Sequence, residues 1–431
     1  MEASLTNANV TLLDFNQFDS QMAQLKAQGV RIFGPNATVS QDMEPEYVSI
    51  SPDNNTAYVV AQENNAVVIV DLVGDSIVSI NPLGWKDHSK AGNGMDSDRK
   101  ADEIHIANPP FRGFYMPDAI ATYEVNGTNF IVSANEGDSR DYDGFSEEDR
   151  LDDITLNPDS FPNAEELVDA FGDIKITLAN GDEDNDGIYD AVYTYGARSF
   201  SIWNGSTGAL VYDSGDDLEQ IVKNHPKYFK LFNVTDDGIK IKSRSDDKGP
   251  EPESVALGEI NTKQYAFIGL ERTGGVVVYD ITDPNNPEFV DININRDTAD
   301  GSGDQAPEGL IFIPQSSSPT SRALLVAANE ESSTISIWQI NDTITSLNEE
   351  VEKLEKALSV YPNPSSDQIF ISVENETIQR VQLFDISGKL IKETQSGRKV
   401  HNLQVNDLAP NVYFLRIQTE SGIQTAKVVV R

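Results

Sequence analysis

An acidic loop between positions 182 and 190 carries the sharpest chemical signal in the sequence. Carboxylates occupy its first, third, fifth and ninth positions, and Gly187 at the sixth position permits a tight turn. Oxygen ligands at this spacing form the shell that Ca²⁺ prefers. Position twelve is Tyr193 and not the bidentate Glu of an EF-hand, so this would be a calcium loop without the paired helices; a solvated acidic turn is the alternative. The predicted metal ligands are Asp182, Asp184, Asp186, Ile188 and Asp190.

A second set of carboxylates recurs along the chain in a fixed pattern. Four segments begin with proline and a carboxylate and continue as an apolar strand. Each segment then returns as a second strand that ends at another glutamate. The first carboxylates are Glu46, Asp118, Glu253 and Glu308, and their second-strand partners are Glu63, Glu136, Glu271 and Glu330.

The recurring hairpins predict an all-β fold made of the blades of a β-propeller. A third strand follows three hairpins directly, at 66–71, 275–280 and 334–340, whereas a long insertion postpones it to 198–203 in the second repeat. A sandwich of unrelated hairpins is the alternative. Four repeats are few for a closed ring, and open sheet edges are a liability, so we expect an incomplete propeller with further blades upstream of Met1.

The innermost strands of a propeller point their ends at a central channel, which would gather these carboxylates. Crowded carboxylates repel one another unless a cation or a basic side chain neutralises them. One hypothesis is metal-assisted hydrolysis, in which Ca²⁺ activates water and basic groups hold a phosphate. The other hypothesis is that every blade needs the same turn and buried ion pair. The catalytic candidates are Glu46, Asp118, Glu136, Glu253, Glu271 and Glu308, and the phosphate or anion-binding candidates are Arg140, Arg198, Arg244, Lys248 and Arg272.

Composition excludes several other classes of protein. The formal net charge of −38 argues against nucleic acid as a partner, because phosphate contacts need clustered Lys and Arg. The absence of cysteine excludes disulfides, thiol nucleophiles and Cys-ligated zinc. No apolar run approaches the roughly 20 residues of a membrane helix, so we expect no membrane span. Histidine gives little support for catalysis, and we interpret His88 as a surface residue in a loop.

The C-terminal region has the short alternating runs of a small β-sandwich, separated by Gly, Asn and Pro. A generic immunoglobulin-like module would show the same alternation. The Tyr-Pro-Asn-Pro opening at 361–364, the hairpin at 385–389 and the strand at 412–416 together resemble the type A C-terminal sorting domain of the type IX secretion system of Bacteroidetes. Over residues 358–431 this resemblance implies the type IX secretion machinery as a partner. It also implies export through the periplasm and outer membrane to the cell surface or the medium.

A charged segment precedes this region, and its apolar residues recur at helical spacing. This spacing predicts a helical linker over 342–357.

The larger N-terminal region carries several polar motifs in series. They are Val30 to Pro35, Glu44 to Tyr47, Lys86 to His88, Asn135 to Tyr142 and Ser243 to Glu253. Together they resemble the choice-of-anchor I family. The resemblance implies a seven-bladed type of YVTN or WD40-like propeller over residues 1–341, carried on various surface anchors and here without its N-terminal blades. Some members of that family are described as alkaline phosphatases.

These observations predict a secreted or cell-surface, calcium-binding β-propeller that acts as a binding module for an unknown surface ligand. The alternative is a calcium-dependent extracellular phosphoesterase, similar to an alkaline phosphatase or a phytase, with a phosphate ester as substrate. Both hypotheses require Ca²⁺, so metal binding alone does not separate them.

Overall fold

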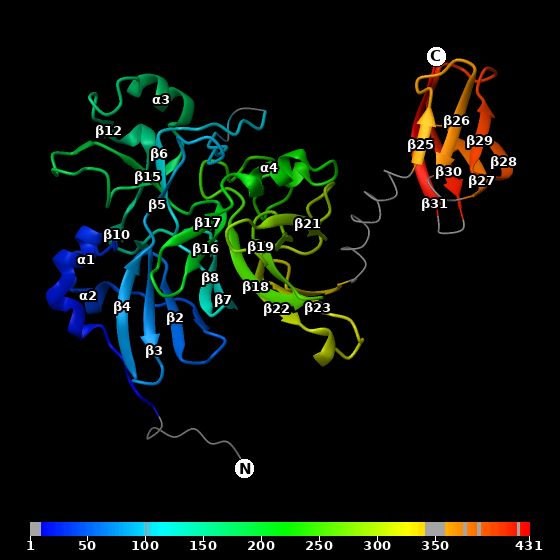
Figure 1. The fold of residues 1–431 in the computed structure, drawn as a ribbon. Helices are drawn as coiled ribbons and strands as arrows, with labels where there is room; N and C mark the ends of the chain where they lie inside the picture. The colour runs from blue at the N-terminus through cyan, green and yellow to red at the C-terminus, as the bar shows by residue number, and fades with distance from the viewer. Residues whose placement is uncertain are drawn as a thin grey trace, which may run out of the picture. The chain divides into compact units, whose positions relative to one another are not determined.

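The computed structural model describes residues 10–98, 100, 103–340, 358–373, 377–385, 389–419 and 423–431. The chain forms two compact units, Met1–Ile340 and Asn341–Arg431 (Figure 1). Strands dominate both units, as the sequence predicts. The helical linker predicted over 342–357 lies outside the described residues.

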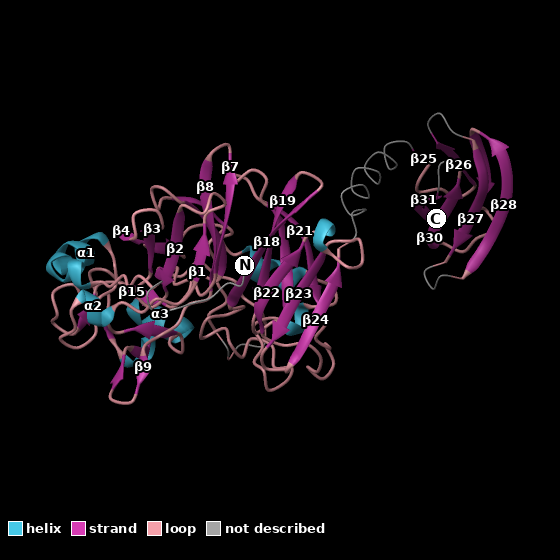
Figure 2. Cartoon of the chain, turned by 90° about the horizontal axis from the view of Figure 1, so that it is seen from below, coloured by secondary structure: helices cyan, strands magenta, loops and turns pink. Residues whose placement is uncertain are grey.

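Four antiparallel meanders form the framework of the first unit (Figure 2). The first sheet contains β1 (Val48–Ile50), β2 (Thr56–Ala61), β3 (Ala66–Asp71) and β4 (Ser76–Pro82). The second contains β7 (Ile120–Val125), β8 (Thr128–Asn135), β16 (Ser199–Asn204) and β17 (Leu210–Asp213). The third contains β18 (Pro252–Ile260), β19 (Lys263–Leu270), β20 (Gly275–Asp280) and β21 (Glu288–Ile294). The fourth contains β22 (Pro307–Ile313), β23 (Leu324–Asn329) and β24 (Thr334–Gln339).

Two-residue turns set the register of two inner hairpins. Asn126 and Gly127 join β7 to β8 with φ values of 52° and 79°. Asn261 and Thr262 join β18 to β19 with φ values of 50° and 67°. Positive φ at both turn positions gives a backbone twist that matches the twist of the flanking strands. The register then fixes which face each apolar side chain occupies.

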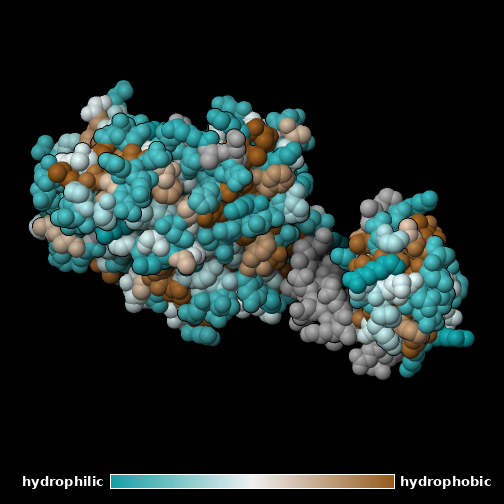
Figure 3. Space-filling view, turned by 90° about the horizontal axis from the view of Figure 1, so that it is seen from above, coloured by the Kyte–Doolittle hydropathy of each residue, from teal (hydrophilic) through white to brown (hydrophobic). Residues whose placement is uncertain are grey.

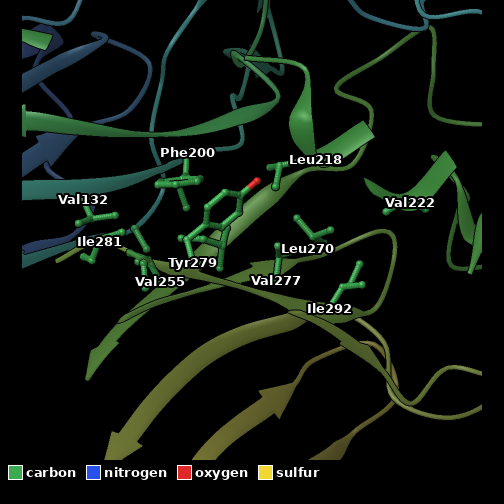
Figure 4. Packing of buried hydrophobic residues seen from close by; sticks show 14 of the residues in the cluster. Val132, Phe200, Leu218, Val222, Val255, Leu270, Val277, Tyr279, Ile281 and Ile292 are labelled. Carbon is green, nitrogen blue, oxygen red and sulfur yellow. The ribbon is translucent and has the colours of Figure 1, made fainter. Parts of the chain in front are cut away.

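Apolar side chains hold neighbouring sheets face to face. The largest core cluster joins the second and third sheets and includes Phe200 and Tyr279, whose ring centroids are 4.6 Å apart (Figure 4). A second cluster, which includes Trp203, joins the first and second sheets. Phe267 stacks on Phe312 between the third and fourth sheets. Each sheet is therefore buried against the next one along the chain.

The first strands of the four sheets lie next to one another. β1 lies beside β7, β7 beside β18, and β18 beside β22. Each sheet thus turns its first strand toward its neighbours, with the remaining strands following in order, which is the arrangement of propeller blades. The predicted β-propeller fold is confirmed, including the postponed third strand of the second blade.

Two insertions are attached to the blades. The first, between β4 and β7, contains β5 (Trp85–Asp87) and β6 (Phe111–Phe114). The second, between β8 and β16, supplies β15 (Val192–Thr194), which pairs with β6. Its other elements are β9 (Asp141–Tyr142), β10 (Phe145–Ser146), β11 (Glu148–Arg150), η3 (Leu151–Asp153), β12 (Thr155–Leu156), α3 (Ala164–Phe171), β13 (Lys175–Thr177) and β14 (Ile188–Tyr189).

The second insertion leaves and re-enters its blade through two glycines that touch. Gly137 and Gly196 have φ values of 87° and 68°. A Cβ on Gly137 would collide with the amide nitrogen of Gly196, and a Cβ on Gly196 would collide with the carbonyl oxygen of Glu136. Only glycine fits at these two positions.

Helical segments cover parts of the blades. Three of them pack on the first sheet: η2 (Asn16–Gln21), α1 (Met22–Gln28) and α2 (Val39–Asp42). Two others contribute to the core of the second and third sheets: α4 (Asp217–Asn224) and η4 (Phe229–Leu231). η5 (Gln315–Ser317) follows β22. No helix in the described part of the chain has both the length and the apolar character needed to cross a bilayer. The face of the first unit seen in Figure 3 is mainly hydrophilic, in keeping with the net charge of −38.

The second unit is a small β-sandwich, as predicted. One sheet contains β25 (Leu358–Tyr361), β26 (Gln368–Val373) and β29 (Val400–Gln404). The other contains β27 (Ile378–Phe384), β28 (Leu390–Arg398), β30 (Asn411–Gln418) and β31 (Ile423–Val430). Alternate side chains such as Ile369, Ile371, Leu415 and Ile417 are fully buried between the sheets. The unit therefore has its own core.

Phe200→Ala tests the packing between the second and third sheets. The ring is fully buried, and its removal leaves a cavity against Tyr279, so we expect the free energy of unfolding of the first unit to fall by about 3–5 kcal/mol. Urea denaturation followed by circular dichroism measures this change. Leu210→Ala, at an exposed position of β17, is the control, with an expected loss below about 1 kcal/mol. Equal losses in the two variants would contradict the packing described here.

Candidate functional site

Carboxylates gather where the first strand of a blade begins and the second strand ends. These two points lie at one edge of a sheet because the strands are antiparallel. The Asp118 amide accordingly donates to the Ala134 carbonyl at 3.2 Å. Asp118 and Glu136 of the second blade meet Glu253 of the third blade, and their ligand oxygens lie within 4.8 Å of one another. The structure therefore brings three of the predicted channel carboxylates into one cluster.

The backbone is strained directly before three of the four proline–carboxylate pairs. Met116, Glu251 and Ala306 precede these prolines and have φ values of 43°, 50° and 55°. Positive φ is unfavourable for residues other than glycine, and a residue before proline prefers extended backbone. Such strain persists only where the surrounding structure enforces it. The repeated conformation is therefore part of how these blades aim the residue after proline.

β-Bulges add to this effect in the third and fourth blades. The pairing register shifts near the start of β18 and near the start of β22. The shift leaves Glu253 and Ser254 out of the regular ladder in β18, and it leaves out Glu308 in β22. A bulge re-aims side chains that would otherwise alternate with their neighbours. Glu253 is buried in this arrangement, whereas Glu308 is exposed.

Burial makes the three-carboxylate cluster costly to ionise. Glu136 and Glu253 are only 7% and 8% exposed. Burial, followed by the charges of Glu271, Glu136 and Glu308, raises the pKa of Glu253 to about 11. Burial and the neighbouring Glu136 raise the pKa of Asp118 to about 8. Without a cation, both groups hold protons at neutral pH.

Glu251 is the centre of an adjacent and fully neutralised cluster. It is fully buried and accepts from Arg244 Nε at 2.8 Å and from Arg272 Nε at 2.9 Å, with Lys248 Nζ at 3.7 Å. Burial acts to raise its pKa, but the three cations outweigh burial and lower the pKa to about 2. Sequence reasoning did not select Glu251 as a site residue. The available signal was its place between two basic residues and the Pro252-Glu253 pair.

The remaining predicted carboxylates surround these two clusters. Glu271 contacts Arg272 Nη2 at 2.9 Å, and burial and Glu251 raise its pKa to about 9. Glu46 and Glu308 are exposed, although both are close enough to raise the pKa of Asp118. Burial raises the pKa of Glu63 to about 7. The exposed pair forms a rim beside the buried carboxylates.

Three of the five predicted anion-binding residues lie together, and two lie elsewhere. Arg244, Lys248 and Arg272 share Glu251, as described above. Arg140 pairs with Asp42 at 2.9 Å and with Glu44 at 3.1 Å. Arg198 is buried, pairs with Glu219 at 2.9 Å and donates to backbone carbonyls of residues 96, 245 and 247. Each of the five cations therefore already has a carboxylate partner.

A polar hollow opens beside the Glu251 cluster. Its volume is about 310 Å³. Its lining includes three basic side chains, Lys175, Arg244 and Lys248. It also includes four acidic side chains, Asp138, Asp141, Glu148 and Asp247. Six of its lining residues belong to the second insertion and three to the segment before β18. The hollow offers both donors and acceptors to a ligand, with mixed charge.

The acidic loop lies in the second insertion, between β13 and β14. Oxygens of Asp182, Asp184 and Asp186 lie within 4.8 Å of one another. The amides of Asp186 and Gly187 donate to the Asp182 carboxylate at 3.1 and 2.9 Å, and the Ile188 amide donates to Asp186 at 2.8 Å. Asp190 accepts from Asn157 Nδ2 at 2.6 Å and is not among the three converging side chains. The turn thus gathers three of the five predicted ligands.

The interpretation of His88 as a surface residue is wrong. His88 is 1% exposed, and its Nδ1 lies 2.7 Å from the Asn93 carbonyl. Burial, followed by the charge of Lys86, lowers its pKa to about 3. Neighbours within the first insertion enclose it: its backbone carbonyl accepts from Asn108 Nδ2 at 2.8 Å, and its Nε2 lies against Gly113. His88 is thus a neutral, buried group.

The fold and the site define an all-β protein of the propeller class with a carboxylate-rich convergence of its inner strands. The family model for the choice-of-anchor I domain matches residues 1–284, and the model for the secretion system C-terminal sorting domain matches residues 359–431. The chain belongs to the choice-of-anchor I family. Its sorting domain is of the type IX secretion system, and the chain is a secreted, cell-surface protein.

Two relatives extend this comparison. Gigasin-3a of Magallana gigas is 31% identical over 172 residues, which cover 36% of this chain and 60% of that protein. Mesenchyme-specific cell surface glycoprotein of Strongylocentrotus purpuratus is 26% identical over 328 residues, 64% of this chain and 41% of that protein. The chain therefore spans less than two thirds of either relative. Among solved structures, the WD40 domain of Toxoplasma gondii coronin has a TM-score of 0.29 at 10% identity, covering 70% of this chain and 46% of that chain.

Glu253→Gln is expected to stabilise the metal-free protein at pH 8. The folded pKa of about 11 lies above the ordinary value of 4.5, so the group's stabilising contribution is complete below pH 4.5 and is lost as pH rises. Glutamine removes this loss, and the free energy of unfolding should rise by at least about 1 kcal/mol. Urea unfolding in excess EDTA at pH 5 and pH 8 measures the change, with Glu259→Gln at an exposed position of β18 as control.

Glu251→Gln is expected to have the opposite effect. Its folded pKa of about 2 lies below the ordinary value of 4.5, so its stabilising contribution is present above pH 4.5 and is lost as pH falls toward 2. Glutamine leaves three buried or half-buried cations without their shared anion, and the free energy of unfolding should fall by about 3–5 kcal/mol at pH 8. The same urea series tests this, and changes of one sign at both positions would refute the two-cluster description.

Proposed function

We propose that the chain is a secreted surface-binding module whose second insertion binds Ca²⁺ in its acidic loop. The observation that carries this proposal is the convergence of Asp182, Asp184 and Asp186 within 4.8 Å. Ligand oxygens lie about 2.4 Å from Ca²⁺, so oxygens on one ion are at most about 4.8 Å apart. One ion can therefore contact all three side chains.

Calcium in this loop would order the surface of the insertion. Asp184 and Asp186 are exposed and repel each other when both are ionised, and a cation removes that repulsion. The same insertion supplies walls of the polar hollow described above. The side chains of the loops around this hollow can differ without changing the strands of the blades, because surface loops tolerate substitution. We place the contact surface for an unidentified ligand there.

The contacts of the basic residues favour binding over hydrolysis. A phosphoesterase needs cations free to receive a phosphate. Arg244, Lys248 and Arg272 instead share Glu251, and each makes a further carboxylate contact. A phosphate at this position would compete with a buried anion that already has three partners. The phosphoesterase hypothesis therefore has less support from the geometry than the binding module.

Calcium titration of the chelator-treated full chain tests the proposal. Isothermal titration calorimetry should show binding with a dissociation constant of roughly 10⁻⁴ M, the range of extracellular modules. Asp182→Asn combined with Asp184→Asn should abolish the binding that belongs to the loop, because two of its three charged ligands become neutral. Asp159→Asn, at an exposed position of the same insertion, is the matched control and should bind as the unmodified chain does.

The phosphoesterase alternative is tested on the same samples. The full chain with saturating Ca²⁺ should release no nitrophenol from p-nitrophenyl phosphate above the rate of the solution without protein. Calcium-dependent release that EDTA abolishes would overturn the assignment as a binding module. Calcium binding that is unchanged in the Asp182→Asn, Asp184→Asn variant would overturn the assignment of the loop.

A further inference from the structure

The three-carboxylate cluster between the second and third blades has more negative charge than its surroundings neutralise. Glu136 contacts Lys248 and accepts from Gln62 Nε2 at 3.0 Å. Among the described residues, neither Asp118 nor Glu253 has an ion pair with a basic side chain. The neighbouring cations are engaged by Glu251, as shown above. The fold thus holds two further carboxylates beside Glu136 with no positive partner.

Glu253 gives a second and independent indication. Its side chain is more than nine-tenths buried, and its Oε2 atom has no hydrogen-bond partner. An unpaired buried polar atom is destabilising and is rare in folded proteins. Both the strained residue before Pro252 and the bulge that follows it maintain this placement. The carboxylate is therefore held toward the cluster at a cost that a ligand would offset.

We propose that Asp118, Glu136 and Glu253 form a second Ca²⁺ site, which links the second blade to the third. Their ligand oxygens lie within 4.8 Å of one another, the greatest separation that one Ca²⁺ ion with ligands at about 2.4 Å allows. The site is distinct from the acidic loop, which lies in the second insertion and uses other residues. It does not depend on calcium binding by that loop.

The donor atoms determine the class of cation. All three ligands are carboxylates, and the chain contains no cysteine. Oxygen-only sites suit hard cations, and three anionic ligands in a buried position favour Ca²⁺ over Mg²⁺, which keeps most of its water. Glu46 and Glu308, exposed at the rim, provide an acidic path from solvent. Water and these rim carboxylates can complete the coordination shell.

Lys248 remains neutralised when the cluster holds an ion. Its Nζ atom lies 3.7 Å from Asp138 and 3.7 Å from Glu251, in addition to its contact with Glu136. It can therefore keep two carboxylate partners while Glu136 turns one oxygen to the cation.

The number of bound ions tests this proposal. Chelator-treated full chain is dialysed against radioactive ⁴⁵Ca²⁺, and bound ions per chain are counted. We expect two ions for the unmodified chain and one for Glu253→Gln or Asp118→Asn. We also expect one for the loop variant Asp182→Asn, Asp184→Asn, and none for the loop variant combined with Glu253→Gln. Circular dichroism of each variant in EDTA confirms that it is folded.

A second measurement reports on the blades themselves. Calcium should raise the Tm of the loop variant, because the buried site persists there, and should not raise it once Glu253→Gln is added. Glu259→Gln is the matched control and should keep the rise. One ion per chain, lost in the loop variant and kept in both Glu253→Gln and Asp118→Asn, would overturn the buried site while leaving the loop intact. One ion lost in Glu253→Gln but kept in the loop variant would support the buried site and overturn calcium binding by the loop.

Discussion

The interaction on which the interior of the first unit depends is the capture of three basic side chains by one buried carboxylate, Glu251. Lys248, Arg244 and Arg272 come from the segment before the third blade and from the end of its second strand, so this contact fixes the start of β18 against the end of β19. It also divides the carboxylates at this edge into two groups. Those beside Glu251 share its cations, whereas Asp118 and Glu253 form no ion pair with them among the described residues. Because burial prevents water from screening the second group, its charge must be carried by protons or by a metal ion.

The same edge shows how local backbone and long-range packing cooperate. Positive φ before proline is unfavourable in isolation, yet it recurs at Met116, Glu251 and Ala306. Face-to-face packing of the sheets, with Phe200 against Tyr279 in the core between the second and third, holds the blades in place and enforces this conformation. The second and third blades can then present Asp118 and Glu253 to each other, whereas Glu308 of the fourth blade lies exposed at the rim. The free energy gained by packing the apolar core thus offsets the unfavourable backbone conformation and crowded carboxylates at the strand ends.

Much of the fold was predictable because it follows from short-range patterns. Alternating apolar strands, Asn and Gly turns and the repeated Pro-carboxylate pairs indicate the blades, and the repeats also predict which strand ends meet. The contacts of the charged groups were not predictable, because they depend on burial and on residues distant in sequence. Arg198 pairs with Glu219 and Arg140 with Asp42, and neither pairing has a local signal. Glu251 was missed although Arg244 and Lys248 are near it in sequence, because its burial and its contact with Arg272 become visible only when the start of β18 and the end of β19 are placed together. His88 was misjudged because its burial depends on Asn108 and Gly113, which lie about 20 residues or more further along the chain.

The facing glycines at 137 and 196 have a consequence for how such a surface can change. The ends of a long insertion usually have to be brought together from a distance, and the entropy lost in doing so grows with its length. Here the two ends are already in van der Waals contact, directly after Glu136. The insertion therefore leaves and rejoins the blade at a single place. Segments that replace part of the insertion can begin and end at this junction with the ends of β8 and β16 unchanged, provided that the pairing of β15 with β6 is kept. The junction is thus a natural site for grafting, at which recognition can be altered separately from the scaffold that carries it.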